Sequence, residues 1–255
     1  MNVIVTDSPL NIETEYFEVK ILNRPIHWPT FGAIVIIHLG ALIAPFYFSW
    51  QGLACLIALY CYTGCIGITF CYHRMLTHRG FKLNAIAKWF AHLAGALALQ
   101  GRPLDWVMSH RIHHARSDKK GDPHSPLDGS LWSHFLWLIP RRNKQSNNLL
   151  IAKYTPDLLQ DRCCVFFNRT YIFWNILLGA ALLGFGGLSC FLWGFCLRTA
   201  MVWHMTWLIN SATHIWGYRN YTTSDQSRNL WWVAILAYGE GWHNNHHEQY
   251  NCGRH

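Results

Sequence analysis

The apolar residues of this chain gather in long stretches that are separated by polar parts. A helix that crosses the hydrocarbon layer of a membrane needs about 20 apolar residues. Residues 30–49 meet this requirement, and residues 53–71 meet it again after a short turn at Trp50-Gln51-Gly52. We therefore predict two transmembrane helices here, which form a hairpin.

A second pair of apolar stretches follows at residues 170–185 and 188–209, joined at Gly186-Gly187. The first member is short for a transmembrane helix, and the second contains Arg198 and His204. A pair of helices buried in the protein core is therefore an alternative. We favour two more crossings, because an arginine in a membrane helix can extend its charge to the interface or meet a polar partner.

Two shorter apolar stretches are unsuited to crossing a membrane. Residues 85–99 are too few and include Lys88 and His92, so we expect a helix at the interface or one covered by protein. We expect the same of residues 230–238. The stretch from 141 to 161 is polar and is interpreted as a surface connection.

The distribution of charge supports a membrane topology and argues against binding to nucleic acid. Only 13% of the residues are charged, against roughly 25% in an average soluble domain, and the formal net charge is +8. No charged residue lies between Arg24 and Arg74, and only Arg198 lies between Arg169 and Arg219. Long neutral gaps between basic stretches are typical of membrane proteins, so we exclude nucleic acid as a partner.

Four crossings place both termini and the middle segment on the same side of the membrane. That side holds 20 of the 21 Lys and Arg residues, so the positive-inside rule makes it cytoplasmic. We therefore predict an all-α integral membrane protein with a single domain over residues 1–255. Its four transmembrane helices form two hairpins, and a cytoplasmic helical cap comprises residues 72–168 and 210–255.

Three histidine clusters lie in this predicted cap, with the sequences H-R-M-L-T-H, H-R-I-H-H and H-N-N-H-H. Residues three and four apart share a helix face, so each H-x-x-H-H cluster can direct several imidazoles to one point. The two histidines of the first cluster are five apart and do not share a face; we expect them where a helix ends or on different metals. The clusters contain His73, His78, His110, His113, His114, His243, His246 and His247.

Eight clustered histidines are too many for one ordinary metal site, and two metals are the simplest interpretation. Imidazole suits iron, zinc, copper and nickel. Zinc usually takes four ligands, often with cysteine, and no cysteines have that spacing here. Soluble di-iron bundles use paired E-x-x-H motifs, of which only Glu240-x-x-His243 occurs.

Histidines outside the clusters are interpreted as structural, because a lone histidine is more often packed than a ligand. A non-catalytic metal-binding or transport protein is an alternative class. Such a protein needs polar residues along its transmembrane helices, and apart from Arg198 and His204 they are nearly absent. The histidines interpreted as structural are His27, His38, His92, His134 and His204.

The clusters and their surroundings resemble the membrane fatty acid desaturases, specifically the delta-9 group. The similar stretches are GITFCYHRMLTHRGFKL, LALQGRPLDWVMSHRIHHARSDKKGDPHSPLDGSLWSHFLWL, TWLINSATHIWGYRNY and SRNLWWVAILAYGEGWHNNHHEQY. Sterol desaturases and alkane hydroxylases share histidine clusters, but not GEGWHNNHH or NSATHIWG. DWVMSHRIHH and the last stretch are most similar to the cyanobacterial and plant members.

The resemblance implies one more metal ligand, His214, and a companion, Asn210, that reaches a metal through water. It also implies a bent acyl tunnel with its kink at Gln100, Trp106 and Thr206, for which packing or an interfacial role is the alternative. Charged residues near the second cluster could orient its imidazoles or be solvated surface charges. These are Asp105, Arg116, Asp122 and Asp128.

The family resemblance implies two iron ions and O2 as co-substrate, which together insert a cis double bond at the delta-9 position of a saturated acyl chain. One hydrogen leaves each of two adjacent carbons, water is the co-product, and two electrons come from an external donor. The chain has no C-x4-C-x2-C pattern of its own. We therefore expect ferredoxin, or alternatively cytochrome b5, as the electron donor at the cytoplasmic face.

A glycerolipid-bound acyl group is the expected substrate, because Gly101 and Met108 stand where the animal acyl-CoA members have Asn and Arg. The alternatives are an acyl-CoA delta-9 desaturase and a di-iron fatty acyl hydroxylase. Similarity to the cyanobacterial branch suggests the thylakoid or plasma membrane of a cyanobacterium. Family members usually continue beyond the third cluster with a Trp-rich segment, whereas this sequence ends at His255, so we consider a truncated form or a fragment.

Overall fold

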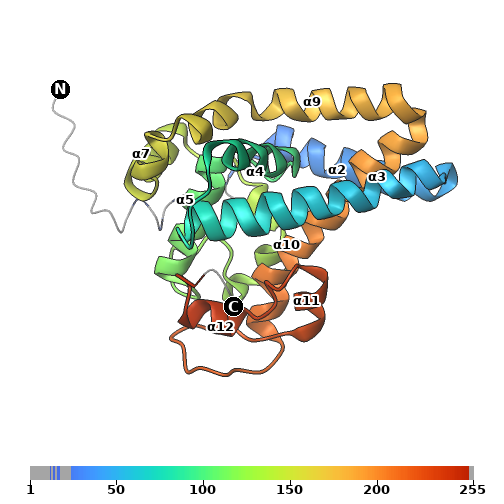
Figure 1. Ribbon diagram of the computed structural model, residues 1–255. Coiled ribbons are helices and arrows are strands. Elements are labelled where there is room, and N and C mark those ends of the chain that lie inside the picture. The colour runs from blue at the N-terminus through green and yellow to red at the C-terminus, as the bar shows by residue number, and fades with distance from the viewer. Residues whose placement is uncertain (1–11, 13, 15, 18–23, 253–255) are drawn as a thin grey trace.

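The computed structural model describes residues 12, 14, 16, 17 and 24–252, and the regular elements of this part are all helices (Figure 1). Among these residues there is no β-strand, only isolated β-bridges between loops. The all-α prediction is therefore confirmed for the described residues. Three helical segments are long and apolar enough to cross a membrane: Trp28–Tyr47, Trp50–Thr77 and Arg162–Ile215.

The first two of these segments meet at a turn just before Trp50. The Ser49 hydroxyl accepts a hydrogen bond of 3.0 Å from the Gly52 amide, which satisfies one of the unpaired amides at a helix start. Trp50-Gln51-Gly52 thus form the first turn of a helix rather than the predicted connection. The elements are α2 (Trp28–Ile43), the short 3-10 helix η2 (Ala44–Tyr47) and α3 (Trp50–Tyr60).

The continuation of α3 is wound as a π-helix, η3 (Cys61–Thr77), whose backbone hydrogen bonds span five residues rather than four. The His78 amide accordingly donates to the His73 carbonyl at 3.2 Å. Side chains five residues apart therefore lie on one face of this helix. The prediction that His73 and His78 do not share a face is wrong, because it assumed α-helical winding. The expected helix end is present, since η3 ends at Thr77 and His78 caps it.

Helices α4 (Ala85–Leu97) and α5 (Pro103–Arg116) pack against η3. The contact with α4 is very close at Gly67, where an added Cβ would lie 2.5 Å from backbone atoms of Ala94. The opposite face of α4 leaves Phe90 62% exposed. The stretch predicted to be interfacial or covered by protein is therefore a helix with one covered and one open face.

The third apolar segment reverses direction within its helical run (Figure 1). Gly186 and Gly187 leave helical geometry, and the φ of Gly187 is +62°, a left-handed conformation that favours glycine. The turn predicted at these two glycines is therefore present. The elements of this segment are α9 (Arg162–Phe191), the π-helical η6 (Leu192–Leu197) and α10 (Arg198–Ile215).

Arg198 is fully buried at the start of α10. Its guanidinium donates to the carbonyl of Leu97 at 2.8 Å and to that of Gly194 at 3.0 Å. Leu97 ends α4, and a cation is favourable there because the unpaired carbonyls of a helix end carry partial negative charge. Arg198 therefore meets polar partners inside the protein, one of the two outcomes expected for it.

The remaining elements are short and lie outside the three long segments. The stretch from 141 to 161, interpreted from the sequence as a surface connection, instead forms two helices that bury Leu150 and Leu158. The elements are η4 (Pro126–Asp128), α6 (Ser130–His134), η5 (Leu136–Leu138), α7 (Lys144–Tyr154), α8 (Pro156–Leu159), α11 (Trp231–Leu236) and α12 (His243–Glu248).

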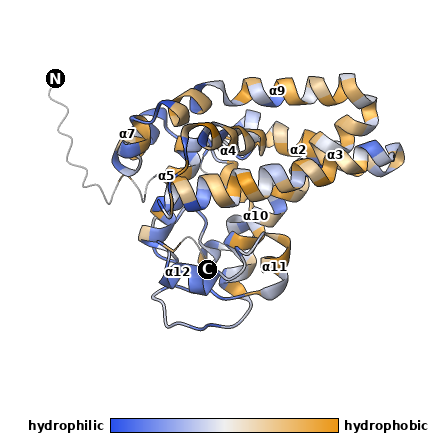
Figure 2. Ribbon diagram, viewed as in Figure 1, coloured by the Kyte–Doolittle hydropathy of each residue, from blue (hydrophilic) through white to orange (hydrophobic). Residues whose placement is uncertain are grey.

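The outer faces of the long helices are apolar (Figure 2). Ile36, Phe46, Ile176 and Phe185 are between 67% and 85% exposed. Soluble monomers rarely expose contiguous apolar surface of this extent. These faces therefore indicate a membrane protein.

Gly67→Ala is expected to destabilise the contact between η3 and α4. The added methyl group meets backbone atoms of Ala94 at 2.5 Å, and backbone cannot yield as a side chain can. Overpacking of this kind costs about 1–3 kcal/mol, so the thermal unfolding midpoint in detergent should fall. Gly32→Ala is the control, because no atom lies within 4 Å of its added methyl. Equal midpoints for the two variants would contradict this account of the packing.

Candidate metal centre

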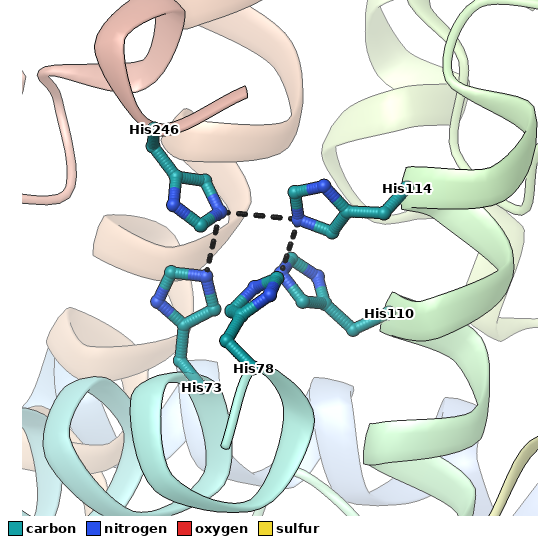
Figure 3. Close-up of side chains that lie close together, drawn as sticks. All are labelled: His73, His78, His110, His114 and His246. Carbon is teal, nitrogen blue, oxygen red and sulfur yellow. Dashed lines mark hydrogen bonds between the residues drawn. The ribbon is translucent and has the colours of Figure 1, made fainter. Parts of the chain in front are cut away.

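Five histidine side chains from three elements converge on one point (Figure 3). Nε2 of His246 lies 3.1 Å from Nε2 of His73 and 3.1 Å from Nε2 of His114. Nε2 of His114 lies 3.2 Å from that of His110. The ligand atoms of the whole group lie within 4.8 Å of one another; its members are His73, His78, His110, His114 and His246.

Four further histidines form a second group, which also draws on α5 and α12 and adds a residue of α10. Nε2 of His243 lies 3.1 Å from that of His214 and 3.0 Å from that of His247. The group consists of His113, His214, His243 and His247. All nine histidines that the sequence and its resemblance propose as ligands thus lie in one of the two groups.

Each H-x-x-H-H cluster divides its histidines between the two groups. His110 and His114 of α5 belong to the first group and His113 to the second. In α12, His243 and His247 belong to the second group and His246 to the first. In each H-x-x-H-H cluster, the histidines at i and i+4 therefore belong to one group. The histidine at i+3 belongs to the other group.

Four buried or half-buried carboxylates hold these imidazoles by their Nδ1 atoms. A carboxylate that accepts the Nδ1 hydrogen fixes the orientation of the ring and leaves a bare lone pair on Nε2. The hydrogen-bonded pairs are Asp122 with His113 at 2.9 Å, Asp118 with His214 at 2.9 Å and Asp225 with His247 at 2.7 Å. Glu240 Oε2 lies 2.8 Å from His73 Nδ1 as an ion-pair contact.

The converging Nε2 atoms fit bound cations. Nε2 of His243 faces the lone pairs of His214 and His247, and its single hydrogen could satisfy only one of them. Nε2 of His113 is buried and has no hydrogen-bond partner among the described residues. Lone pairs this close repel each other unless a positive ion lies between them. The donor set therefore fits two metal ions, one with five and one with four imidazoles.

The electrostatics of the site keep these imidazoles neutral. Burial lowers the pKa of His113 to about 3 and that of His247 to about 4, and it lowers the pKa of His110 well below its usual range. Burial alone would raise the pKa of Asp118, but the interactions with His214, the hydrogen bond from the Gln226 amide and the nearby His113 together outweigh burial and bring that pKa to about 2. Neutral imidazoles beside ionised carboxylates are the protonation states that a metal ligand requires.

An apolar pocket lies against both histidine groups. Its wall includes His73 and His110 of the first group and His243 of the second. Most of the remaining wall is apolar, from Ile68 on η3 to Val202 on α10. The pocket is therefore lined by histidines of both groups.

The three residues proposed for the tunnel kink are joined by hydrogen bonds. Trp106 Nε1 donates to Gln100 Oε1 at 3.1 Å, and Gln100 Nε2 donates to Thr206 Oγ1 at 2.8 Å. Trp106 and Thr206 line the pocket. Asn210 lines it too, one helical turn before His214. The structure thus gathers these residues at the pocket beside the metal centre.

Sequence reasoning found only one of the four orienting carboxylates. Asp122 was among the charged candidates, whereas Asp105 accepts a hydrogen bond from Asn147 instead and Asp128 is exposed. The missed carboxylates are Asp118, Asp225 and Glu240. Glu240 stands three residues before His243, and this spacing pointed to His243 as its partner. Its carboxylate instead orients His73.

The histidines interpreted as structural pair mainly with one another or with backbone. Nε2 of His38 lies 3.1 Å from Nε2 of His204, and Nδ1 of His204 lies 3.0 Å from Nε2 of His134. Nδ1 of His92 lies 2.8 Å from the Lys88 carbonyl. None of these four belongs to a candidate metal group within the described residues.

Acidification is expected to destabilise the metal-free protein. The folded chain lowers the pKa of His113 to about 3 and that of His247 to about 4, whereas an unfolded histidine keeps a pKa of 6.5. The unfolded state therefore binds more protons below about pH 6.5, and the free energy of unfolding falls as the pH falls further. Thermal unfolding followed from about pH 7.5 to about pH 5 measures this. A midpoint that stays constant or rises would contradict buried neutral histidines.

Asp225→Asn is expected to weaken metal binding about 10- to 100-fold, as is usual when a residue that orients a ligand is altered. The amide still accepts the His247 Nδ1 hydrogen but lacks the negative charge that makes the imidazole a better donor. Titration of the purified protein with Fe2+ or Co2+ measures the affinity. Asp128→Asn is the matched control, because that carboxylate is exposed and binds no cluster histidine. Equal affinities would rule out an orienting role for Asp225.

Comparison with known proteins places this site in a family. Residues 23–249 match the fatty acid desaturase family. The chain is 44% identical over 232 residues to an sn-1 stearoyl-lipid 9-desaturase of Anabaena variabilis, covering 90% of this chain and 84% of the relative. It is 41% identical over 227 residues to an sn-2 palmitoyl-lipid 9-desaturase of Nostoc, covering 88% and 80%.

A plant relative is equally similar. The chloroplastic palmitoyl-monogalactosyldiacylglycerol delta-7 desaturase of Arabidopsis thaliana is 44% identical over 236 residues, which cover 88% of this chain and 61% of that protein. The matches span all three histidine clusters, His214 and the pocket. The chain belongs to the fatty acid desaturase family.

Proposed function

We propose that this chain is a membrane desaturase that inserts a cis double bond at the delta-9 position of a saturated acyl chain carried by a glycerolipid. The observation that carries this proposal is the apolar pocket whose wall includes His73, His110 and His243. A methylene group in this pocket would lie against histidines of both groups. Relatives named as stearoyl-lipid and palmitoyl-lipid 9-desaturases support the same reaction and substrate class.

We assign an iron ion to each histidine group, with O2 as the co-substrate. Bound iron supplies the oxidising power that an unactivated C–H bond requires and that side-chain acid–base chemistry lacks. The nine histidines would hold the ions, and Asn210 would reach one of them through a water molecule. The carboxylates behind the imidazoles supply negative charge without occupying a ligand position.

The pocket residues position the acyl chain and exclude water. We assign the bend of the acyl tunnel to Gln100, Trp106 and Thr206, which are joined by hydrogen bonds and of which the last two line the pocket. A chain that follows this bend is held kinked at the carbons next to the metals, which favours a cis product. Holding the reacting carbons in place converts a difficult encounter into a reaction within one complex.

The topology that suits this chemistry has four crossings, with the histidine centre on the cytoplasmic face. The reversal at Gly186-Gly187 divides the third apolar segment into two arms, each of which would cross once. The membrane would be the thylakoid or plasma membrane, given the similarity to cyanobacterial relatives.

Two electrons come from ferredoxin, with cytochrome b5 as the alternative donor. Lys119 and Lys120 are exposed next to Asp118, whose carboxylate holds His214. An acidic donor that docks on these lysines comes close to the metal centre, since charge complementarity accelerates and orients such encounters.

Expression in a desaturase-deficient host, followed by lipid profiling, tests the proposed function. We expect a delta-9 monounsaturated acyl chain on glycerolipids with the native chain. No product is expected with His110→Ala, because that variant removes a ligand that also lines the pocket. His27→Ala is the matched control, since His27 lies outside both groups.

Three outcomes would contradict this assignment. Undiminished product from His110→Ala would refute the metal site. A product that gains an oxygen instead of losing two hydrogens would indicate a hydroxylase. Efficient desaturation of stearoyl-CoA by the purified protein would favour the acyl-CoA alternative.

A further inference from the structure

Residues 230–241 form a closed loop, here called the flap, that carries α11 and ends next to α12. The two ends of the flap are joined where the Leu230 amide donates to the Gly241 carbonyl at 2.8 Å. A β-bridge between Asn229 and Trp242 continues this junction. Compact loops with joined ends are frequently functional. The flap is thus a unit with a fixed base at the metal centre.

The inner side of the flap is a wall of the pocket. Ala237, Tyr238 and Glu240 all line it. The Tyr238 ring lies on Gly64 of η3, and an added Cβ at Gly64 would come within 2.6 Å of that ring. Only glycine leaves room for the ring there. Tyr238 therefore closes the contact between the flap and the transmembrane segment that contains η3.

The outer side of the flap is apolar and exposed. Trp231, Ile235 and Leu236 of α11 are 61%, 71% and 43% exposed, and Figure 2 shows α11 as largely hydrophobic. The opposite face of α11 packs on α10 through Val233, which is fully buried. A short helix with a Trp and aliphatic residues facing outward beside a membrane segment is suited to the bilayer interface. The flap thus separates the pocket from an apolar surface.

Two hydrogen bonds fasten the flap to the long helix. The Tyr60 hydroxyl donates to the Leu236 carbonyl at 2.7 Å, and the Tyr238 hydroxyl donates to the Tyr60 carbonyl at 2.9 Å. We call this pair of bonds the latch. Tyr238 has a φ of +54° and Gly239 a φ of +98°. A bulky residue with a positive φ has a strained backbone. The latch therefore holds closed a segment whose opening would relieve this backbone strain.

We infer that the flap is a lateral portal through which the acyl chain of a bilayer glycerolipid enters the pocket, and that the latch closes it. This inference rests on the proposed function and specifies the path of its substrate. A glycerolipid is held in the bilayer by its other chain and its headgroup. Its acyl chain reaches a buried pocket most directly through an apolar wall that faces the lipid, and the flap is such a wall.

Tyr60→Phe tests the portal, because it removes one bond of the latch and Tyr60 does not line the pocket. We expect the KM for a diacyl lipid in nanodiscs to fall about two- to ten-fold, since the closed state loses one hydrogen bond. The single-turnover rate with lipid already bound and the position of the double bond should not change. Tyr62→Phe is the matched control, because its hydroxyl donates to the Phe90 carbonyl at 2.8 Å, away from the pocket.

Other results would overturn the portal. An unchanged KM would show that the latch does not limit entry. A single-turnover rate that changes by the same factor as steady-state turnover would make Tyr60 a positioning residue. A shifted double bond would mean that the flap sets the depth of the chain.

A second measurement uses the unaltered protein and needs no turnover. The chain is reconstituted in phosphatidylcholine vesicles that contain a diacyl glycerolipid with a diazirine in its saturated chain, and is then irradiated. We expect labelled peptides that contain α11 and the Tyr60–Ile68 part of the long helix. Labelling confined to α9 would overturn the portal. Absence of unsaturated product from the native chain would count against the proposed function. It would not count against the portal, which the labelling tests separately.

Discussion

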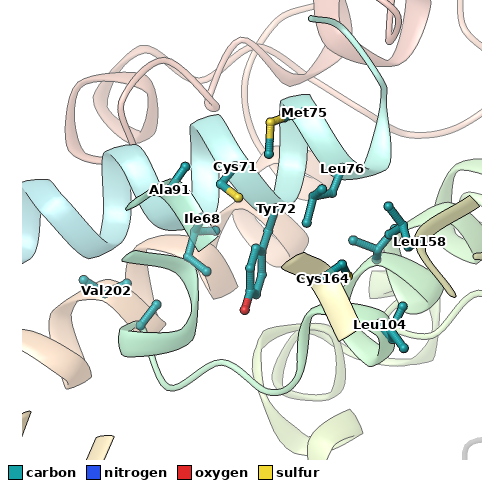
Figure 4. Close-up of a cluster of buried hydrophobic side chains, with 12 residues drawn as sticks. Ile68, Cys71, Tyr72, Met75, Leu76, Ala91, Leu104, Leu158, Cys164 and Val202 are labelled. Carbon is teal, nitrogen blue, oxygen red and sulfur yellow. The ribbon is translucent and has the colours of Figure 1, made fainter. Parts of the chain in front are cut away.

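The repulsion between converging imidazole lone pairs is the constraint on which the rest of this structure depends. Histidines of four elements bring Nε2 atoms to about 3 Å from one another. A neutral imidazole has one ring hydrogen, so the hydrogen of His243 can lie in only one of its two close contacts. Buried carboxylates fix tautomers from behind, and bound cations would balance the lone pairs in front. The core contacts of the central π-helix, drawn in Figure 4, keep its histidines in register with those of α5.

Helix winding distributes the ligands between the two metals. In an α-helix, residues at i and i+4 differ by about 40° in direction, whereas i+3 lies about 60° to the other side. One H-x-x-H-H cluster can therefore serve two ions at once, with a pair on one and a single residue on the other. His73 and His78 are five apart and would diverge in such a helix. The π-helix η3 brings them into the same histidine group instead.

The part of the site that could be predicted from sequence is the part whose spacing is local. The three clusters, the apolar stretches and the glycine turn at Gly186-Gly187 are readable because each depends on neighbouring residues. Asp118 and Asp225 lie in loops with no periodic pattern, and the histidines they hold are 96 and 22 residues away. The π-helical winding of η3 was equally hidden, because nothing in its apolar pattern distinguishes hydrogen bonds to the fifth residue from those to the fourth. These features depend on tertiary packing.

Glu240 joins the flap to the metal centre and thereby limits how the flap can open. Its carboxylate lies 2.8 Å from His73 Nδ1 and 2.9 Å from Arg74 Nε, and it is buried. Separating a buried ion pair costs about 3–5 kcal/mol. Each hydrogen bond of the latch contributes only about 0.5–1.5 kcal/mol. The latch is therefore the weaker of these two polar attachments, so we expect the flap to open at Tyr238 and α11 while Glu240 stays in place. Substrate can then enter without disturbing the orientation of His73.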